Sequence, residues 1–359
     1  MNRLFWGGVA LIILGVGIYF FVPTEKTGTA TLGVIAGTTG QYASAGEGYL
    51  KGFELAREEW NKSRALQFNE VVEDDGFDSK KGISAYTKLK SIDNVDAYAI
   101  LSTFTIDVVN DDVTTEGKPV ALGFEQSTAA TNDSIFQVLP AARPIQKKLG
   151  EELKQNYKKP FAVVSDNTPV YENFYSGFVE GYAGEIHKEM VHDDAALART
   201  LATKIMSSGS DVVVFFTAPK DGALVVRELV RQYAGAPLPQ LAFDQSIQSG
   251  IQDYKEILGS DLPKLDGAIV ALSKNDLTQT FKDAYKTKYS FDAPFAADMG
   301  YNSFMLLATT YDADHATWVQ NMKSAKFIGA DGEVSFDATG LRIPNVAFGL
   351  LQNGVVVVK

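Results

Sequence analysis

The chain alternates between short runs of apolar residues and longer segments in which apolar residues recur every three or four positions. The first such pair is the run 32–36, followed by a periodic pattern through Tyr49, Phe53, Ala56 and Trp60. Short apolar runs predict buried strands, and the wider spacing predicts an amphipathic helix. Because strands and helices alternate, the pattern predicts parallel βαβ units with helices on both faces of a sheet.

This alternation extends over two halves of the chain. In the first half it predicts strands at 68–73, 96–101 and 119–122 and helices at 79–92 and 107–115. In the second half it predicts strands at 161–165, 187–191, 211–216, 240–243 and 267–272 and helices at 171–182, 197–206 and 221–233. Helical patterns near 277–289 and 296–311 follow, and then strand patterns at 332–336, 346–351 and 355–358. The sequence therefore predicts two α/β lobes in tandem.

The first residues have a different pattern. Residues 4–22 form an apolar run without a charged side chain. At about 1.5 Å per residue, this run approaches the thickness of a bilayer core, about 30 Å. It favours an uncleaved signal anchor over a cleaved signal peptide, whose apolar core spans roughly 7–15 residues. Arg3 before the run predicts that the body lies outside the cytoplasm, in the periplasm or at the cell surface, tethered to the cytoplasmic membrane.

Composition and charge exclude several classes of function. The 33 basic and 44 acidic residues give a net charge of −11, which disfavours nucleic-acid binding because phosphate contacts need cations. The chain has no cysteine, so it has no disulfide, thiolate metal site or cysteine nucleophile. Three histidines leave little room for histidine-based catalysis or a metal site, and we expect them on the surface or in packing. No enzyme motif is found, so we expect neither catalytic residues, metal nor cofactor.

Polar residues follow several predicted strands. Ser102, Thr103 and Thr105 come after one strand of the first half, and Asp244 comes after a strand of the second half, where Tyr171 begins a helix. Ligands of open α/β sheets bind at the carboxyl ends of strands. Hydroxyls beside a helix N-terminus suit a carboxylate, and an acid with an aromatic ring suits an ammonium group. The alternative at each loop is that these side chains only cap helices.

The segment 32–46 resembles the opening of the branched-chain amino-acid-binding proteins, which are type I periplasmic substrate-binding proteins of ABC transporters. Four further segments resemble the same family in the correct order, at 74–79, 166–178, 299–303 and 332–340. The resemblance covers about residues 30–359. The chain departs from the family at Glu172, where a glycine usually follows the tyrosine, and in lacking the cysteine pair of the first lobe.

This resemblance implies two Rossmann-like lobes with parallel sheets flanked by helices, joined by three hinge crossovers near 139–143, 272–275 and 330–344. The apolar run described above predicts a signal anchor or signal peptide with a linker at 1–29. Lobe I is expected to comprise 30–140 and 275–330, and lobe II to comprise 141–274 and 331–359.

The resemblance also implies a site between the lobes. Lobe I would hold a carboxylate through Tyr42, Ser102, Thr103, Phe104, Thr105, Gln126, Ser127 and Thr128. Lobe II would contribute Tyr171, Thr217, Ala218 and Asp244, with Asp244 binding an ammonium group. The implied function is capture of a small molecule, such as an amino acid, and its delivery to an ABC permease. The alternative is a membrane-anchored sensor or adaptor that regulates an envelope partner protein.

Overall fold

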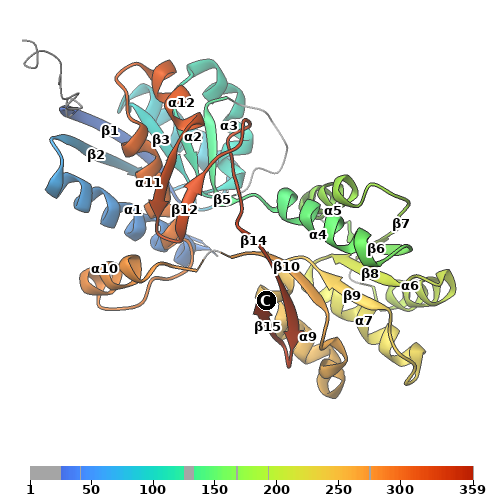
Figure 1. Cartoon of the computed structure of the whole chain (residues 1–359). Helices are drawn as coiled ribbons and strands as arrows, with labels where there is room; N and C mark the ends of the chain where they lie inside the picture. Colours follow the sequence, from blue (N-terminus) through green and yellow to red (C-terminus); the bar gives the residue numbers. More distant parts are fainter. Residues whose placement is uncertain are drawn as a thin grey trace, which may run out of the picture.

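The computed structural model describes residues 26–40, 42–124, 133–166, 169–192, 194–274 and 276–358. They form two α/β lobes, each built around its own sheet (Figure 1). The predicted anchor at 4–22 lies outside the described residues. Within these ranges, no helix combines the length and the apolar character that crossing a membrane requires.

The first lobe contains a six-stranded sheet in which all paired strands are parallel. The strand order is β13 (Leu341–Arg342), β5 (Ile135–Pro140), β4 (Val120–Leu122), β3 (Ala97–Ile100), β1 (Gly28–Ile35) and β2 (Leu66–Glu73). Phe53, Phe68 and Phe304 lie in the core on one face, and Tyr86 and Ile106 lie in the core on the other. The face with Phe53 is covered by α1 (Ala43–Ser63), α11 (Ala297–Thr310) and α12 (His315–Lys323). The opposite face is covered by α2 (Ser79–Ser91) and α3 (Thr103–Glu116).

The remaining elements of this lobe lie beside that core. The helix α10 (Gln279–Tyr289) packs near α1, and its Tyr289 hydroxyl donates to the Lys51 carbonyl at 2.8 Å. The strands β11 (Lys326–Gly329) and β12 (Gly332–Ser335) form a separate two-stranded antiparallel sheet. Both follow α11 and α12 in the chain and precede β13.

The second lobe contains a seven-stranded sheet that is parallel only in part. The strand order is β15 (Val355–Val358), β14 (Val346–Gln352), β10 (Ile269–Ser273), β9 (Gln240–Phe243), β8 (Val212–Phe216), β6 (Pro160–Ser165) and β7 (His187–Val191). The last two strands of the chain, β14 and β15, pair antiparallel at one edge. The helices α4 (Ala142–Asn156) and α5 (Pro169–Tyr182) cover one face. The other face is covered by α6 (Ala195–Ser208), α7 (Pro219–Tyr233), α8 (Ser246–Ser249), α9 (Ile251–Leu258) and the 3₁₀ helix η1 (Gly259–Leu265).

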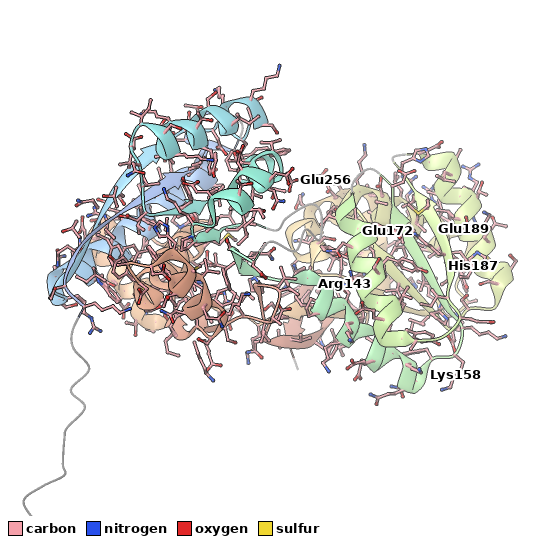
Figure 2. All side chains as sticks on the ribbon, turned by 90° about the horizontal axis from the view of Figure 1, so that it is seen from above. Arg143, Lys158, Glu172, His187, Glu189 and Glu256 are labelled. Carbon is pink, nitrogen blue, oxygen red and sulfur yellow. The ribbon has the colours of Figure 1, made fainter. Side chains whose placement is uncertain are left out.

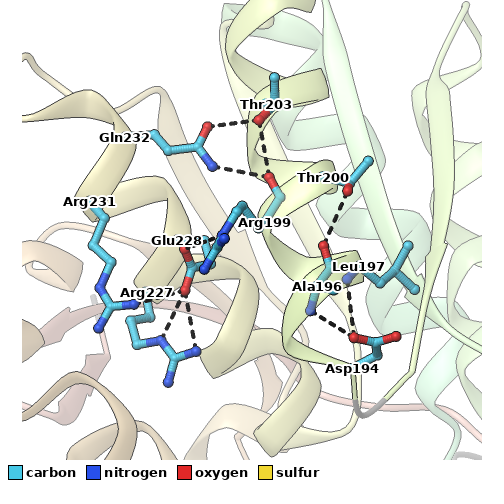
Figure 3. A network of polar contacts seen from close by, with 10 residues as sticks. All are labelled: Asp194, Ala196, Leu197, Arg199, Thr200, Thr203, Arg227, Glu228, Arg231 and Gln232. Atoms are coloured by element: carbon cyan, nitrogen blue, oxygen red, sulfur yellow. Dashed lines mark hydrogen bonds and ion pairs between the residues drawn. The ribbon is translucent and has the colours of Figure 1, made fainter.

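A buried carboxylate joins α6 and α7 on the outside of the second lobe. Arg231 and Arg227 each approach Glu228 Oε1, at 3.0 Å and 3.2 Å, and Arg199 from α6 approaches Oε2 at 3.8 Å (Figure 3). Three guanidinium groups therefore balance one carboxylate that has little contact with water. The contact links α6 to α7.

The histidines lie where the sequence predicts them. His187 stacks on Phe161 with a ring distance of 4.5 Å, and its Nε2 lies 3.2 Å from Glu189 on the outside of the second lobe (Figure 2). His192 and His315 also lie outside the buried core. In the described ranges, no cluster of three or more histidine or acidic side chains could hold a metal ion.

The chain passes between the two lobes at three places that lie side by side. The first crossover links β5 to α4, the second links β10 to α10, and the third links β13 to β14. Ala141 N donates to the Arg342 carbonyl at 3.2 Å, and Lys274 N donates to the Asn345 carbonyl at 2.8 Å. These backbone bonds join the three crossovers into one hinge.

The third crossover lies later in the chain than residue 331, where the sequence analysis expects lobe II to resume. Since β13 (Leu341–Arg342) pairs with β5 in the first sheet, the segment up to Arg342 belongs with the first lobe. The second sheet takes up the chain again at Val346. We therefore propose that lobe I extends to Arg342 and that lobe II resumes near Asn345.

A buried ion pair fixes this end of the first lobe. Arg342 Nη1 and Nη2 donate to the two carboxylate oxygens of Asp331 at 2.9 Å and 3.0 Å. Asn302 Nδ2 also donates to Asp331 at 2.8 Å, and Arg342 donates to the Val138 carbonyl at 3.1 Å. Bidentate geometry with additional hydrogen bonds offsets the cost of burying both charges.

Candidate ligand-binding site

Ser102 lies at the carboxyl edge of the first sheet, two residues after the end of β3. It is the N-cap residue of α3, yet its side chain makes no capping hydrogen bond. Its hydroxyl is buried and has no hydrogen-bond partner among the described residues. A buried hydroxyl beside a helix N-terminus can donate to an anion, and the N–H groups of the first helical turn add to that attraction.

Thr105, by contrast, makes a bond within the protein. Its Oγ1 donates to Asp75 Oδ2 at 2.6 Å, and Phe77 N donates to Asp75 Oδ1 at 3.1 Å. The sequence placed the start of the helix at 107, but α3 begins at Thr103, so Thr105 lies in its first turn. Thr105 therefore holds the loop after β2 against α3. Ligand contact by Thr103 and by the half-exposed Phe104 stays a prediction.

Four aromatic rings follow one another along this edge of the first lobe. Tyr42 meets Phe77 at 5.4 Å between ring centres, Phe77 meets Phe124 at 6.2 Å, and Phe124 meets Phe295 at 5.9 Å. We call these four residues the aromatic wall. The sequence interpretation named only Tyr42. Phe124 lies two residues after a predicted strand and could have been found on that ground, whereas nothing in the local sequence links Phe77 to Phe295.

Asp244 lies in the second lobe directly after β9. The side chain is 1% exposed, and Ser246 N donates to its Oδ1 at 2.6 Å. Its Oδ2 has no hydrogen-bond partner in the described part of the chain. Burial raises the pKa of Asp244 to about 6, although hydrogen bonds from Ser246 and Thr217 act in the opposite direction. The carboxylate therefore has one oxygen available for a cation.

Tyr171 lies in the first turn of α5, close to this carboxylate. Burial raises the pKa of Tyr171 to about 12, and the negative charges of Asp244 and Asp221 add to that effect. Such an electrostatic influence requires the phenol to lie near both acids. The ring is half-buried and packs edge-on against Phe174 at 5.9 Å. That Tyr171 and Asp244 act on the same bound group stays a prediction.

Ser165 completes a hydrogen-bonded network at this edge of the second sheet. Ala218 N donates to Ser165 Oγ at 3.0 Å, and Ser165 Oγ donates to Asp221 Oδ2 at 2.6 Å. The buried Thr217 accepts a bond from Ser246 Oγ at its carbonyl, at 3.1 Å. Because the hydroxyl proton of Ser165 is engaged by Asp221, this network offers acceptors rather than donors to a ligand.

The structure gathers the predicted residues at two strand edges. Tyr42 and Ser102 lie at the edge of the first sheet, and Tyr171, Thr217, Ala218 and Asp244 lie at the edge of the second. Gln126, Ser127 and Thr128 lie outside the described residues. Contact of all these residues with one ligand stays a prediction.

Glu172 occupies the position after Tyr171 where the family pattern usually has a glycine. Lys188 Nζ from β7 donates to Glu172 Oε2 at 2.6 Å, and the same ammonium lies 4.5 Å from the ring centre of Tyr175. Figure 2 shows Glu172 on the outer helix of the second lobe. Its carboxylate is thus neutralised by a neighbouring strand of the same lobe.

The fold and these strand-end residues define a two-lobed solute-binding protein. Residues 29–350 match the family model of the periplasmic binding proteins, and the chain belongs to that family. The family is one of solute-binding proteins rather than enzymes.

A curated relative gives the next comparison. The chain is 28% identical over 212 residues to a Leu/Ile/Val-binding protein homolog from Brucella melitensis. The match covers 55% of this chain and 57% of the relative, so the chain spans little more than half the length of that protein. This similarity confirms the resemblance inferred from the sequence.

Solved structures confirm the type I two-lobe fold. A putative branched-chain amino acid ABC transporter protein from Rhodospirillum rubrum superposes with a TM-score of 0.74 at 14% identity, covering 92% of this chain and 100% of that one. An ABC transporter substrate-binding protein from Desulfitobacterium hafniense, in complex with Leu, superposes with a TM-score of 0.68 at 18% identity, with coverage of 92% and 100%.

Proposed function

We propose that this protein captures an α-amino acid between its two lobes and delivers it to an ABC permease. The observation that carries the proposal is the carboxylate oxygen of Asp244 that has no hydrogen-bond partner among the described residues. A buried charge without a partner costs free energy in the empty protein. A ligand ammonium group removes that cost by supplying a charge-assisted hydrogen bond.

The opposite charge of the ligand fits the first lobe. Ser102 supplies a buried hydroxyl without a partner in the described ranges, at the start of α3. A carboxylate there accepts from the hydroxyl and interacts favourably with the helix N-terminus. An amino acid carries both charges on one carbon, so it can join Ser102 in one lobe to Asp244 in the other.

Lobe closure then follows from the division of contacts. A ligand shifts an equilibrium between open and closed forms only by binding them unequally. A zwitterion that needs both lobes gains its second set of contacts only when the lobes approach, and the hinge of three crossovers permits that motion. The closed form is the one that a permease would recognise.

The anchor predicted at 4–22 fits the same function. A binding protein held at the membrane meets its permease at a raised effective concentration. The apolar run at the start of the chain supports this part of the proposal.

Calorimetry with the full chain tests the capture of an amino acid. We expect saturable binding of at least one branched-chain or aromatic amino acid. The matching acid without the amino group, such as 4-methylpentanoate for leucine, should bind at least about tenfold more weakly, because it leaves Asp244 unpaired. Equal affinity for leucine and 4-methylpentanoate would refute the ammonium site, and the absence of binding by any amino acid would refute the proposed function.

A further inference from the structure

We propose that the aromatic wall (Tyr42, Phe77, Phe124 and Phe295) receives the side chain of the ligand and selects an aromatic amino acid over an aliphatic one. This inference rests on the proposed function, since it names the side chain of the amino acid bound there.

Two rings of the wall are unusually exposed for their size. Phe295 is 66% exposed and Tyr42 is 52% exposed, while Phe77 and Phe124 behind them are partly buried. Clustered apolar groups that remain exposed on a folded protein mark a binding surface. The contacts between the four rings make the surface continuous rather than a set of scattered side chains.

The backbone holds Phe77 in place at an energetic cost. Its φ of 56° lies in the left-handed region, which a phenylalanine rarely adopts. Asp75 accepts from Phe77 N, and a side-chain carbon on Gly37 would lie only 2.3 Å from the Phe77 ring. The ring therefore lies directly on the Gly37 backbone, and any larger residue there would displace it.

The loop that carries Phe295 is fixed in a similar way. The next residue, Ala296, has a φ of 67°, again in the left-handed region. A side-chain carbon on Gly48 would lie 2.2 Å from the Phe295 carbonyl oxygen, so this loop packs directly onto α1. Strained backbone at two separate loops that present neighbouring rings indicates a preorganised binding surface.

Two residues of the wall are connected to the segment that carries Ser102, the place proposed for the ligand carboxylate. Phe124 N donates to the Leu101 carbonyl at 3.1 Å, immediately before Ser102. Asp75 joins Phe77 to Thr105 in the first turn of α3. A ligand with its carboxylate at Ser102 can thus direct its side chain toward the rings.

The orientation of the rings favours an aromatic occupant. Tyr42 meets Phe77 edge-on at 68°, while Phe124 and Phe295 stack at 30°. A ligand ring can extend such an arrangement by an edge-on or offset-stacked contact. An aliphatic chain gains only the burial of its area, since it lacks the quadrupole that orients aromatic pairs.

The test compares affinities of the full chain for L-phenylalanine and L-leucine by calorimetry. We expect L-phenylalanine to bind about three- to tenfold more tightly, the range that an aromatic pair contributes beyond area. In Phe295→Leu that preference should fall to about unity while the affinity for L-leucine changes by less than about twofold. Phe291→Leu is the matched control, because Phe291 lies in the same loop but packs on Tyr285 and Tyr289.

Each other result has a definite meaning. Tighter binding of L-leucine than of L-phenylalanine overturns the selectivity but leaves the proposed function intact. An equal loss of affinity for L-phenylalanine and L-leucine in Phe295→Leu also overturns the selectivity, because the Phe295 ring would then contribute to lobe closure rather than to recognition of the ligand side chain. Binding of neither amino acid, nor of any other, refutes the proposed function together with this inference.

Discussion

The two lobes share an alternating α/β architecture but differ in the residues that follow their strands. At the edge of the first sheet lie four aromatic rings and the hydroxyl of Ser102. At the edge of the second sheet lie the carboxylates of Asp221 and Asp244, with Tyr171 nearby. The strands therefore determine the fold, while the loops between strands and helices carry the residues that we propose bind the ligand.

This difference divides the proposed ligand between the lobes. The first lobe suits an anion and an apolar side chain, and the second suits a cation. In this proposal neither lobe alone binds the whole ligand, so a substitution in the site of either lobe should lower the ligand affinity. The predictions below alter one lobe at a time.

The largest effect is expected for the ion pair of the first lobe. Arg342→Met leaves the buried Asp331 without its guanidinium and should lower the free energy of unfolding of that lobe by about 3–5 kcal/mol. Trp60 and Trp318 both belong to the first-lobe core, so their fluorescence in a denaturant titration reports on it.

Arg199→Met in the second lobe is the matched control for this change. Arg199 is 73% exposed and lies 3.8 Å from Glu228, so its loss should cost less than about 1 kcal/mol. An Arg342→Met protein as stable as the Arg199→Met protein would show that the buried pair does not fix the first lobe.

The next effect concerns Asp244 in the second lobe. Asp244→Asn preserves the shape of the side chain but removes the charge that faces the ligand ammonium. We expect an affinity loss of about 100-fold by calorimetry, in line with the 2–5 kcal/mol cost of truncating one partner of a buried charge pair. An unchanged affinity would exclude Asp244 as the ammonium partner.

The same substitution should stabilise the empty protein. Burial raises the pKa of Asp244 to about 6. The contribution of Asp244 to the free energy of unfolding is therefore fully present at a pH below the pKa that this group has in the unfolded chain, and it is lost as the pH rises through 6. Asp244→Asn should therefore gain about 1–3 kcal/mol over the natural protein at pH 8 and little at pH 4. Thermal melting at both pH values, without ligand, measures this difference.

The sequence predicted most of the fold because strand and helix periods are local. The strands at 187–191 and 240–243 were predicted with their observed bounds. The helix at 142–156 was missed, because its apolar residues Ile145, Leu149 and Leu153 stand among many charged and polar ones. The later lobe boundary that we propose depends on the pairing of β13 with β5, which joins residues about 200 positions apart and which a local pattern does not reveal.

Candidate site residues could be predicted from the sequence where a polar residue closely follows a strand. Asp244 and Ser102 were proposed by that rule, and their contact with a ligand stays a prediction. The aromatic wall was not, because it brings together loops after β1, β2 and β4 with the residue before α11. Thr105 shows what the local sequence does not report: its hydroxyl donates to Asp75 from another loop, and its predicted contact with a ligand stays a prediction.

The pH dependence of ligand affinity distinguishes ionisation of Asp244 in the second lobe from ionisation of Asp298 beside the Arg342 pair. Asp244 must be ionised to bind an ammonium, so affinity should be constant above pH 7 and fall about tenfold per unit below about pH 6. Burial and the charge of Asp331 also raise the pKa of Asp298 to about 6, but this group lies beside the Arg342 pair. Asp298→Asn should keep the pH dependence of affinity, whereas Asp244→Asn should abolish it.

The smallest effect distinguishes the two hydroxyls of the first lobe. Ser102→Ala removes a single neutral donor, and we expect it to lower ligand affinity about three- to tenfold with little change in stability. Thr105→Val should do the reverse, because it leaves the buried carboxylate of Asp75 without its 2.6 Å partner. Calorimetry and thermal melting of both variants measure the contrast. If Thr105→Val lowered affinity more than Ser102→Ala, the anion site would lie in the first turn of α3 rather than at its N-cap, and Asp75 would be a ligand-site residue instead of the support for Phe77.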